Sequence, residues 1–465
     1  MTACEELRRE SISFPRAISP AAWTIPSHAS LFTGLSPAET GCHWKGTLQL
    51  APERPRVSTR LRARGYRTMS LSANPLIEPS FGMVDGFDQV AWSGWWEPFL
   101  RTRSNDPANV LPKSKKAPTS RIASVRKGPI DRIIKKVRPA IIQHPYVMVV
   151  GNRIVHSLKS QTGDGTRRIA QWLEPTFDAW VRRTPADEPI FAFVNLLDAH
   201  EPYFPGPGFS EWRKYRRTRQ DPVAWMNGDW RATKEDFQLL HELYREMILG
   251  MDSRVSSLIG TLKQAGRWDN TAFILTADHG QAFGEHGTLF HFFRVDEQLI
   301  RIPLWLRLPF AESRGSTARG WASLVDVATE SLALGAAPAP SQSTTYRLTE
   351  LVDRDRVTPA IAISDGIVWG HFRSRFRPQG LETFDRVYVA SYSGDTKVVV
   401  DMKSGTNRAY RIDRDPGEER DVWSDSASLN ELSSSARLEG GGLMATRPGE
   451  ISDDVETRLA AWGYV

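Results

Sequence analysis

Two continuous apolar runs of strand length place the strongest constraint on the fold. Residues 190–197 read Ile-Phe-Ala-Phe-Val-Asn-Leu-Leu, and residues 271–277 read Thr-Ala-Phe-Ile-Leu-Thr-Ala. Such runs predict strands that are covered on both faces. Between them, residues 236–265 repeat apolar side chains at helical spacing, which predicts a long amphipathic helix. Strands that alternate with helices predict an α/β domain with a mostly parallel sheet and helices on both faces.

The composition changes along the chain, and the changes mark the expected boundaries. Lys and Arg accumulate over about 101–168, with isoleucines interleaved at helical spacing, which predicts a partly helical basic insert. A Pro/Ala/Ser-rich linker follows residue 335, and later segments predict an antiparallel sheet. We expect a main domain over 1–335, a small α+β subdomain over 336–425, and a mobile Ser/Gly-rich segment with the C-terminal tail over 426–465.

The segment from Trp23 to Gly34 predicts a helix whose first turn is suited to an anionic group. Pro26 fits the first turn, where its missing N–H costs no hydrogen bond, and Gly34 fits the helix end. Thr24 would lie beside unpaired N–H groups and the positive end of the helix dipole, where an anionic ester is best held. The alternative is an ordinary surface helix.

Side chains that can bind metal or move protons follow the predicted strands. Asp278-His279 follows the run at 271–277, His200 follows the run at 190–197, and His291 comes shortly afterwards in the sequence. Ligands gather at the carboxyl ends of strands in open α/β sheets, and an Asp-His pair suits a divalent cation. Each of these residues could instead have a structural role. Asn74 could bind substrate or form a turn before Pro75.

These motifs resemble those of the sulfatase family in the alkaline phosphatase superfamily. Thr24 stands where the family's Cys/Ser-x-Pro-Ser-Arg signature has its nucleophile, and His28 replaces the arginine, as in a Thr-type subgroup. The resemblance implies the alkaline-phosphatase/sulfatase-like α/β fold with a small C-terminal antiparallel subdomain. It also implies roles for the motif residues: metal ligands are Asp278, His279 and Thr24; catalytic residues are Thr24, His200, His291 and His28; substrate-binding residues are Asn74 and His286.

A threonine at the nucleophile position limits the chemistry. Common sulfatases convert Cys or Ser into formylglycine, but the methyl group on the β-carbon of Thr24 prevents an aldehyde, so no formylglycine is expected. A metal-activated threonine could still attack sulfur or phosphorus. We expect a metal-dependent hydrolase of sulfuric esters. The alternatives are a phosphodiester or phosphonate hydrolase or phospho-group transferase of the same superfamily, and an inactive member that binds anionic ligands.

The resemblance implies further metal ligands before Thr24. Family members begin with an apolar strand followed by one or two aspartates, whereas residues 5–24 match the piece that normally comes after them. The implied cation is Ca²⁺, with Mg²⁺, Mn²⁺ or Zn²⁺ as alternatives. Hard cations require more oxygen ligands than Asp278, His279 and Thr24 supply, so we expect weak metal binding. Without the family's first strand, we also expect exposed edges in the sheet.

Charge and cysteine content restrict the expected partners. The net charge of +6 favours an anionic ester substrate, small or polymeric, without indicating nucleic acid. The basic insert could be a solvated helix face or a surface for membrane headgroups or glycans. Cys4 and Cys42 form no disulfide framework and fit a reducing compartment, with Cys42 expected to be a buried thiol. No signal peptide or membrane-spanning run is found, so a cytoplasmic location is expected.

Overall fold

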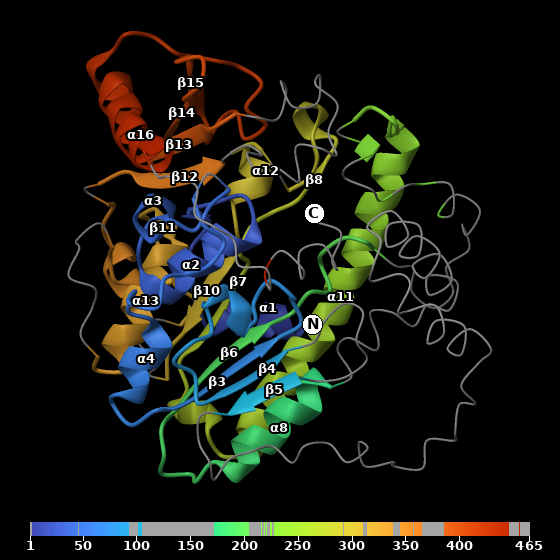
Figure 1. The fold of residues 1–465 in the computed structure, drawn as a ribbon, viewed down its shortest axis with the longest axis vertical. Helices are drawn as coiled ribbons and strands as arrows, with labels where there is room; N and C mark the ends of the chain where they lie inside the picture. Colours follow the sequence, from blue (N-terminus) through green and yellow to red (C-terminus); the bar gives the residue numbers. More distant parts are fainter. Residues whose placement is uncertain are drawn as a thin grey trace.

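The computed structural model describes most of the chain outside the basic insert (Figure 1). The described ranges are residues 2–44, 46–92, 101–104, 172–203, 227–291, 293–309, 314–337, 345–356, 358–364 and 386–445, with single positions at 215, 218, 220, 224, 225 and 455. Apart from strand β5 (Arg101–Ser104), the predicted insert over 101–168 lies outside the described residues, as does the tail after 445 except residue 455.

The main domain contains a four-stranded sheet in the order β5-β4-β3-β6. Strand β3 (Arg67–Ser72) is parallel to both β4 (Gln89–Trp92) and β6 (Ile190–Asn195), and β5 is antiparallel to β4. A second, antiparallel sheet has the order β1-β10-β7, with bounds Ile12–Ser13, Leu304–Arg307 and Phe273–Thr276. Ser72 is in register with Asn195, so the carboxyl ends of β3 and β6 meet at one edge.

Helices cover both faces of the four-stranded sheet, as the sequence predicts. On one face, α8 (Leu173–Arg183) and the long α11 (Lys234–Gln264) pack against Met69 and Leu71 of β3. On the other face, α2 (Thr24–Thr33) packs with Val90 of β4 in a second apolar cluster. The other described helices are α1 (Ala3–Arg9), α3 (Pro37–Thr40), α4 (Val57–Arg62), α12 (Glu297–Ile300), α13 (Leu324–Leu334) and the 3-10 helices Pro79–Phe81, Trp268–Asn270, Glu285–Gly287 and Leu348–Leu351. Short pairs join β2 (Ala17–Ile18) to β11 (Ala322–Ser323) and β8 (Ala282–Phe283) to β9 (Leu289–Phe290).

The prediction that β6 and β7 are fully covered is wrong. Every residue of both strands is only partly buried, although their sequences are apolar. Within the described chain each strand has a single sheet neighbour, β3 for β6 and β10 for β7, so each lies at a sheet edge. Side chains at an edge keep part of their surface exposed even when both faces contact helices.

A second unit follows residue 359 and contains a four-stranded antiparallel sheet. Its order is β12-β13-β14-β15, with bounds Ala360–Ser364, Tyr388–Ser393, Thr396–Asp401 and Asn407–Arg411. The predicted antiparallel C-terminal sheet is therefore confirmed. The finer domain boundaries at 335 and 425 remain predictions.

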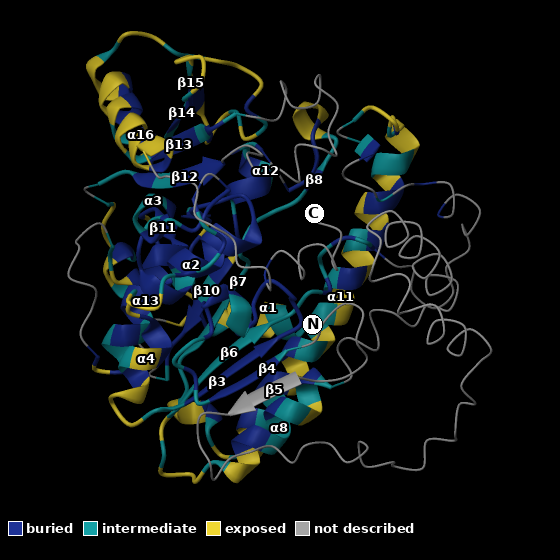
Figure 2. Cartoon of the chain, in the orientation of Figure 1, coloured by how far each residue is buried: buried dark blue, intermediate teal, exposed yellow. Residues whose placement is uncertain are grey.

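The expectation of a mobile segment from residue 426 is wrong for its first part. Residues Ala427–Ala445 form helix α16, which packs against β13 and β14 with one face buried (Figure 2). Leu429, Leu432, Ala436 and Leu443 recur at helical spacing and join the cluster of Val398 and Val400. The Ser and Gly residues lie between these apolar positions and concealed the pattern. None of the described helices combines the length and apolar character needed to cross a membrane.

Candidate active site

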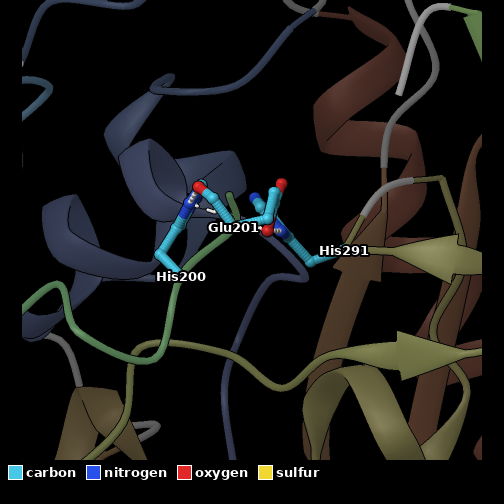
Figure 3. Close-up of side chains that lie close together, drawn as sticks. All are labelled: His200, Glu201 and His291. Atoms are coloured by element: carbon cyan, nitrogen blue, oxygen red, sulfur yellow. Dashed lines mark hydrogen bonds and ion pairs between the residues drawn. The ribbon is translucent and has the colours of Figure 1, made fainter. Parts of the chain in front are cut away.

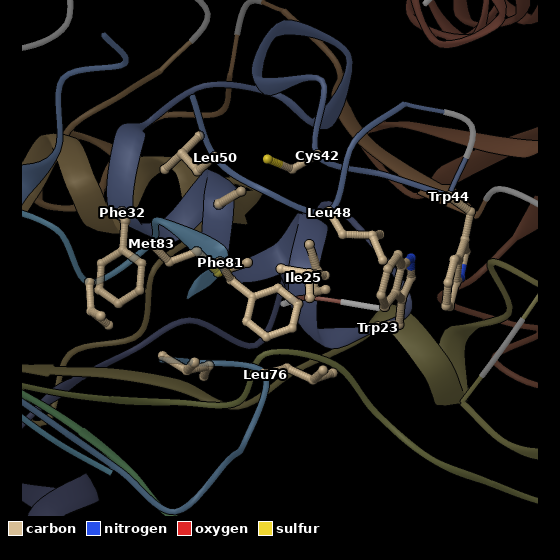
Figure 4. Packing of buried hydrophobic residues seen from close by; sticks show 14 of the residues in the cluster. Trp23, Ile25, Phe32, Cys42, Trp44, Leu48, Leu50, Leu76, Phe81 and Met83 are labelled. Carbon is tan, nitrogen blue, oxygen red and sulfur yellow. The ribbon is translucent and has the colours of Figure 1, made fainter. Parts of the chain in front are cut away.

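Thr24 is held at the first turn of α2 by tight packing. Trp23 caps the helix in an extended conformation, and Gly34 ends it in a left-handed conformation (φ 73°), as the sequence predicts. Ile25 and Phe32 are buried in the apolar cluster beneath the helix, and Trp23 stacks on Trp44 at 4.3 Å between ring centroids (Figure 4). Thr24 itself is 2% exposed. The first turn, with its N–H groups, therefore has little freedom to move.

His28 connects this helix to the residue that follows β7. Its Nδ1 atom lies 2.9 Å from the carbonyl oxygen of Thr24 and 3.5 Å from Oδ2 of Asp278. Burial lowers the pKa of His28, and the nearby carboxylate of Asp278 opposes this shift only in part. The imidazole is therefore neutral near pH 7 and can donate one hydrogen bond from Nδ1.

The Asp278-His279 pair offers a carboxylate and a buried imidazole to the same point. His279 Nδ1 lies 2.9 Å from the carbonyl oxygen of Gly280, which leaves Nε2 as the nitrogen with the lone pair. That Nε2 atom is buried, has no hydrogen-bond partner among the described residues and lies 3.5 Å from Oδ2 of Asp278. Burial alone would raise the pKa of Asp278, but the surrounding imidazoles, led by His279, lower it overall. These donors fit a divalent cation.

His200 and His291 meet at the buried carboxylate of Glu201, which no sequence motif singled out as a site residue (Figure 3). The Oε2 atom of Glu201 lies 3.6 Å from Nδ1 of His200 and 3.5 Å from Nδ1 of His291. Burial would raise the pKa of Glu201, but the two histidines lower it well below its usual range. Burial lowers the pKa of His291 to about 4, although Glu201 opposes the shift.

Gln281 joins this cluster to the Asp278-His279 pair. Its Nε2 donates to Oε2 of Glu201 at 3.0 Å, and its Oε1 lies 3.1 Å from Nδ1 of His291. His279 also stacks on His291 with 4.3 Å between ring centroids. A Cβ atom at Gly280 would lie 2.0 Å from the carbonyl oxygen of Gln298, so the turn between the two motifs requires glycine.

The structure brings five of the predicted residues together: His28, Asp278, His279, His200 and His291. Thr24 joins this group through the contact of His28 with its carbonyl oxygen. The described contacts of the two predicted substrate-binding residues lie elsewhere. Asn74 Oδ1 accepts a hydrogen bond from the N–H of Leu76 at 2.9 Å, which favours the turn alternative.

His286 is exposed and lies near Asp296 and Glu418. Asp198 forms an ion pair with Arg254 at 2.8 Å, which supports a structural role for this carboxylate. Glu201 and Gln281 could have been found from the sequence only by noting that each is a polar residue directly beside a motif histidine or glycine.

Comparison with known proteins gives one consistent result. A family model described as Sulfatase matches residues 1–336. Arylsulfatase K from Canis lupus familiaris is 22% identical over 348 residues, which make up 74% of this chain and 60% of that protein. An N-acetylglucosamine-6-O-sulfatase from Bacteroides thetaiotaomicron is 32% identical over 117 residues, or 25% of this chain and 21% of that protein. The chain thus spans less than two thirds of the length of these relatives.

A solved structure shows the same fold over nearly the whole chain. The phosphonate monoester hydrolase from Silicibacter pomeroyi superposes with a TM-score of 0.63 at 17% identity, covering 95% of this chain and 90% of that chain. At this identity the likeness concerns the fold alone. It confirms the fold class expected from the sequence.

Proposed function

The chain belongs to the sulfatase family, and we propose that it hydrolyses sulfuric esters with Thr24 as the nucleophile. The observation that carries this proposal is the contact of His28 with both Thr24 and Asp278, because it places the first turn of α2 beside the end of β7. Thr24 begins a ten-residue helix, whose N–H groups and dipole favour an anionic group at this position.

A divalent cation belongs to this proposal, with Asp278, His279 and Thr24 as its ligands among the residues of this chain. The ionised carboxylate of Asp278 and the buried Nε2 of His279 fit such an ion, and the resemblance favours Ca²⁺. When bound, the cation would supply positive charge that makes the Thr24 hydroxyl easier to ionise.

In the proposed reaction, Thr24, His200 and His28 have different roles in cleaving the ester. The Thr24 hydroxyl gives its proton to water as Oγ1 attacks the sulfur atom, the bond from sulfur to the ester oxygen breaks, and His200 gives a proton to the departing oxygen. His28 fixes the first turn of α2 while the N–H groups of that turn hold the anionic oxygens. Water then releases sulfate from Thr24 and restores the hydroxyl.

A phosphonate or phosphodiester substrate is the second candidate. Its support is the chemistry of Thr24, because hydrolysis of a covalent phosphoryl intermediate by water is easier than that of a sulfate ester. The fold likeness to a phosphonate monoester hydrolase agrees with this alternative. If the substrate is a sulfuric ester, we propose a sulfated sugar, since one relative is named as an N-acetylglucosamine-6-O-sulfatase.

The deciding experiment assays aryl sulfate, phosphodiester and phosphonate esters side by side, with the divalent cation varied. We expect Thr24→Ala to abolish turnover of the preferred ester and Thr24→Ser to retain part of it. Thr33→Ala is the matched control, because it removes a buried hydroxyl from the far end of the same helix. Full turnover by Thr24→Ala would exclude Thr24 as nucleophile.

A further inference from the structure

We propose that Arg254 is a positioning residue for His200 and acts through the carboxylate of Asp198. Arg254 lies on α11, and its Nε atom donates a hydrogen bond to Oδ1 of Asp198 at 2.8 Å. Asp198 lies two positions before His200, in the segment that follows β6. The inference rests on the proposed function in one respect, the role of His200 in protonating the departing oxygen.

The segment that presents His200 is a tight turn. The N–H of His200 donates to the carbonyl oxygen of Leu197 at 3.1 Å, so Asp198 and Ala199 are the two central residues of a four-residue turn. At the far side of this turn, Nδ1 of His200 lies 2.5 Å from the carbonyl oxygen of Glu201. These contacts keep the imidazole fixed to the backbone around it. A rotation of the turn would therefore carry the imidazole with it.

Arg254 ties this turn to two helices at once. Its Nη1 atom donates to Oε1 of Glu174, in the first turn of α8, at 3.2 Å, while its Nε atom holds Asp198. The side chain of Arg254 is 16% exposed and that of Asp198 is 10% exposed, so water competes weakly for the contact between them. A guanidinium suits this task because it presents several donors in a fixed plane.

The two helices form a firm base for the turn. α8 and α11 lie along the same face of the sheet (Figure 1), and Thr261 of α11 donates to Asp178 of α8 at 3.4 Å. Val255 of α11 packs with Phe177 of α8 in an apolar cluster that Leu197 also contacts. Apolar packing has no preferred direction, whereas a hydrogen bond does. The contact between Asp198 and Arg254 therefore sets the orientation of a turn that apolar contacts only hold close.

The orientation of a proton donor has a kinetic effect that depends on the leaving group. A displacement of about 1 Å, caused by a change far from the reacting atoms, can lower a rate about 100-fold. A nitrophenolate leaves with little help, whereas an alkoxide needs a proton as the ester bond breaks. Loss of the Arg254 contact should therefore slow alkyl esters much more than nitrophenyl esters. A general loss of structure would slow both alike.

The test measures kcat and KM of full-length variants on an alkyl ester and a nitrophenyl ester of the same acid. We expect Arg254→Gln to lower kcat about 10- to 100-fold on the alkyl ester and less than about threefold on the nitrophenyl ester, with little change in KM. Arg254→Lys should recover part of the loss. Arg245→Gln, at an exposed position on the same helix, is the matched control and should leave both rates unchanged.

A double variant shows whether Arg254 acts through His200. His200→Ala should have the same selectivity against the alkyl ester, and adding Arg254→Gln should slow this ester no further, because both changes impair one proton transfer. A further loss of 10-fold or more in the double variant would overturn the positioning role.

Asp198→Ala tests the same contact from its other end and keeps the experiment decisive if Arg254→Gln does not fold, which circular dichroism checks. We expect it to reproduce the selectivity against the alkyl ester. Equal losses on the two esters in the folded variants would overturn the inference and leave the proposed function intact. Equal losses in His200→Ala would instead reject His200 as the proton donor, and the inference with it.

Discussion

The Nδ1 atom of His28 lies 3.5 Å from Oδ2 of Asp278 while it also contacts the carbonyl oxygen of Thr24 at 2.9 Å. One buried imidazole therefore links the helix that carries the proposed nucleophile to the residue that follows β7. The side chain is 2% exposed, so water does not compete strongly for either contact. The relative position of Thr24 and Asp278 depends on this link.

Replacing His28 should therefore reduce turnover without abolishing it. We expect His28→Ala to lower kcat about 10- to 100-fold, the usual effect of losing a residue that orients metal ligands, with a smaller change in KM. His241→Ala is the control, since His241 is exposed on α11. Steady-state kinetics on the preferred ester measures the changes in kcat and KM separately. A kcat equal to that of the unchanged protein would show that the link has no catalytic role.

A divalent cation should stabilise the folded chain through Asp278 and His279. A ligand that binds only the native state raises the melting temperature in a concentration-dependent way. We expect thermal unfolding to shift upward as the cation is titrated, and a chelator to reverse the shift. Asp278→Asn should remove most of the effect, whereas Asp353→Asn, at an exposed position, should keep it. An equal shift in both variants would place the responsible cation elsewhere.

The residues of the candidate site that follow predicted strands could be identified from the sequence. Asp278-His279 comes directly after one apolar run, and His200 comes shortly after the other. Because ligands gather at the carboxyl ends of strands, these residues were expected at one edge of the sheet. The helix that begins at Thr24 was predictable from Pro26 and Gly34, which fix its ends by their backbone preferences alone.

The remaining features depend on contacts between distant segments, which no local pattern encodes. Glu201 can be recognised as a site residue only from its contact with His291, which is 90 positions later in the chain and 3.5 Å away in the structure. The partial burial of β6 and β7 follows from their places at sheet edges, whereas their apolar sequences predict full cover. In helix α16, Ser and Gly residues separate the apolar positions, so the sequence did not reveal that this helix packs on β14.

The thiol of Cys42 should be inert in the folded protein. Burial raises its pKa from an ordinary value of 9.0 to about 12, and the side chain is 0% exposed. In a Cys4→Ser background, we expect alkylation at pH 8 to be at least about 100-fold slower than in denaturant, because the thiolate is the reactive form. Rapid labelling of the native protein would contradict this burial.

The same pKa shift predicts the sign of a stability change. The folded state keeps the Cys42 proton to higher pH than the unfolded state, so the free energy of unfolding should fall as pH rises from about 9 to about 12. Cys42→Ala should reduce that slope in urea unfolding measured across this range. An unchanged slope would assign the loss of stability to other groups.

Lys397 should be the most sensitive position in the C-terminal sheet. Its Nζ atom is fully buried and lies 2.7 Å from Glu418 and 3.2 Å from Glu297. Lys397→Met would leave the buried carboxylate of Glu418 without its cation, whereas Glu297 would keep Arg301 at 2.7 Å. Removing one partner of a buried ion pair costs about 3–5 kcal/mol. Lys403→Met, at an exposed position, should cost less than about 0.5 kcal/mol. Urea unfolding measures both.

The Lys397 variant should also lower activity, because Glu297 begins α12, and this helix supports the candidate site. The carbonyl oxygens of Leu299 and Gln298 accept hydrogen bonds from Gly280 and Gln281 at 2.6 and 2.9 Å. A shift of α12 would therefore move the turn that follows His279. Adding Glu418→Gln to Lys397→Met should recover part of the lost stability by removing one unpaired charge. Stability that falls further in the double variant would show that the carboxylates do not repel each other as the structure implies.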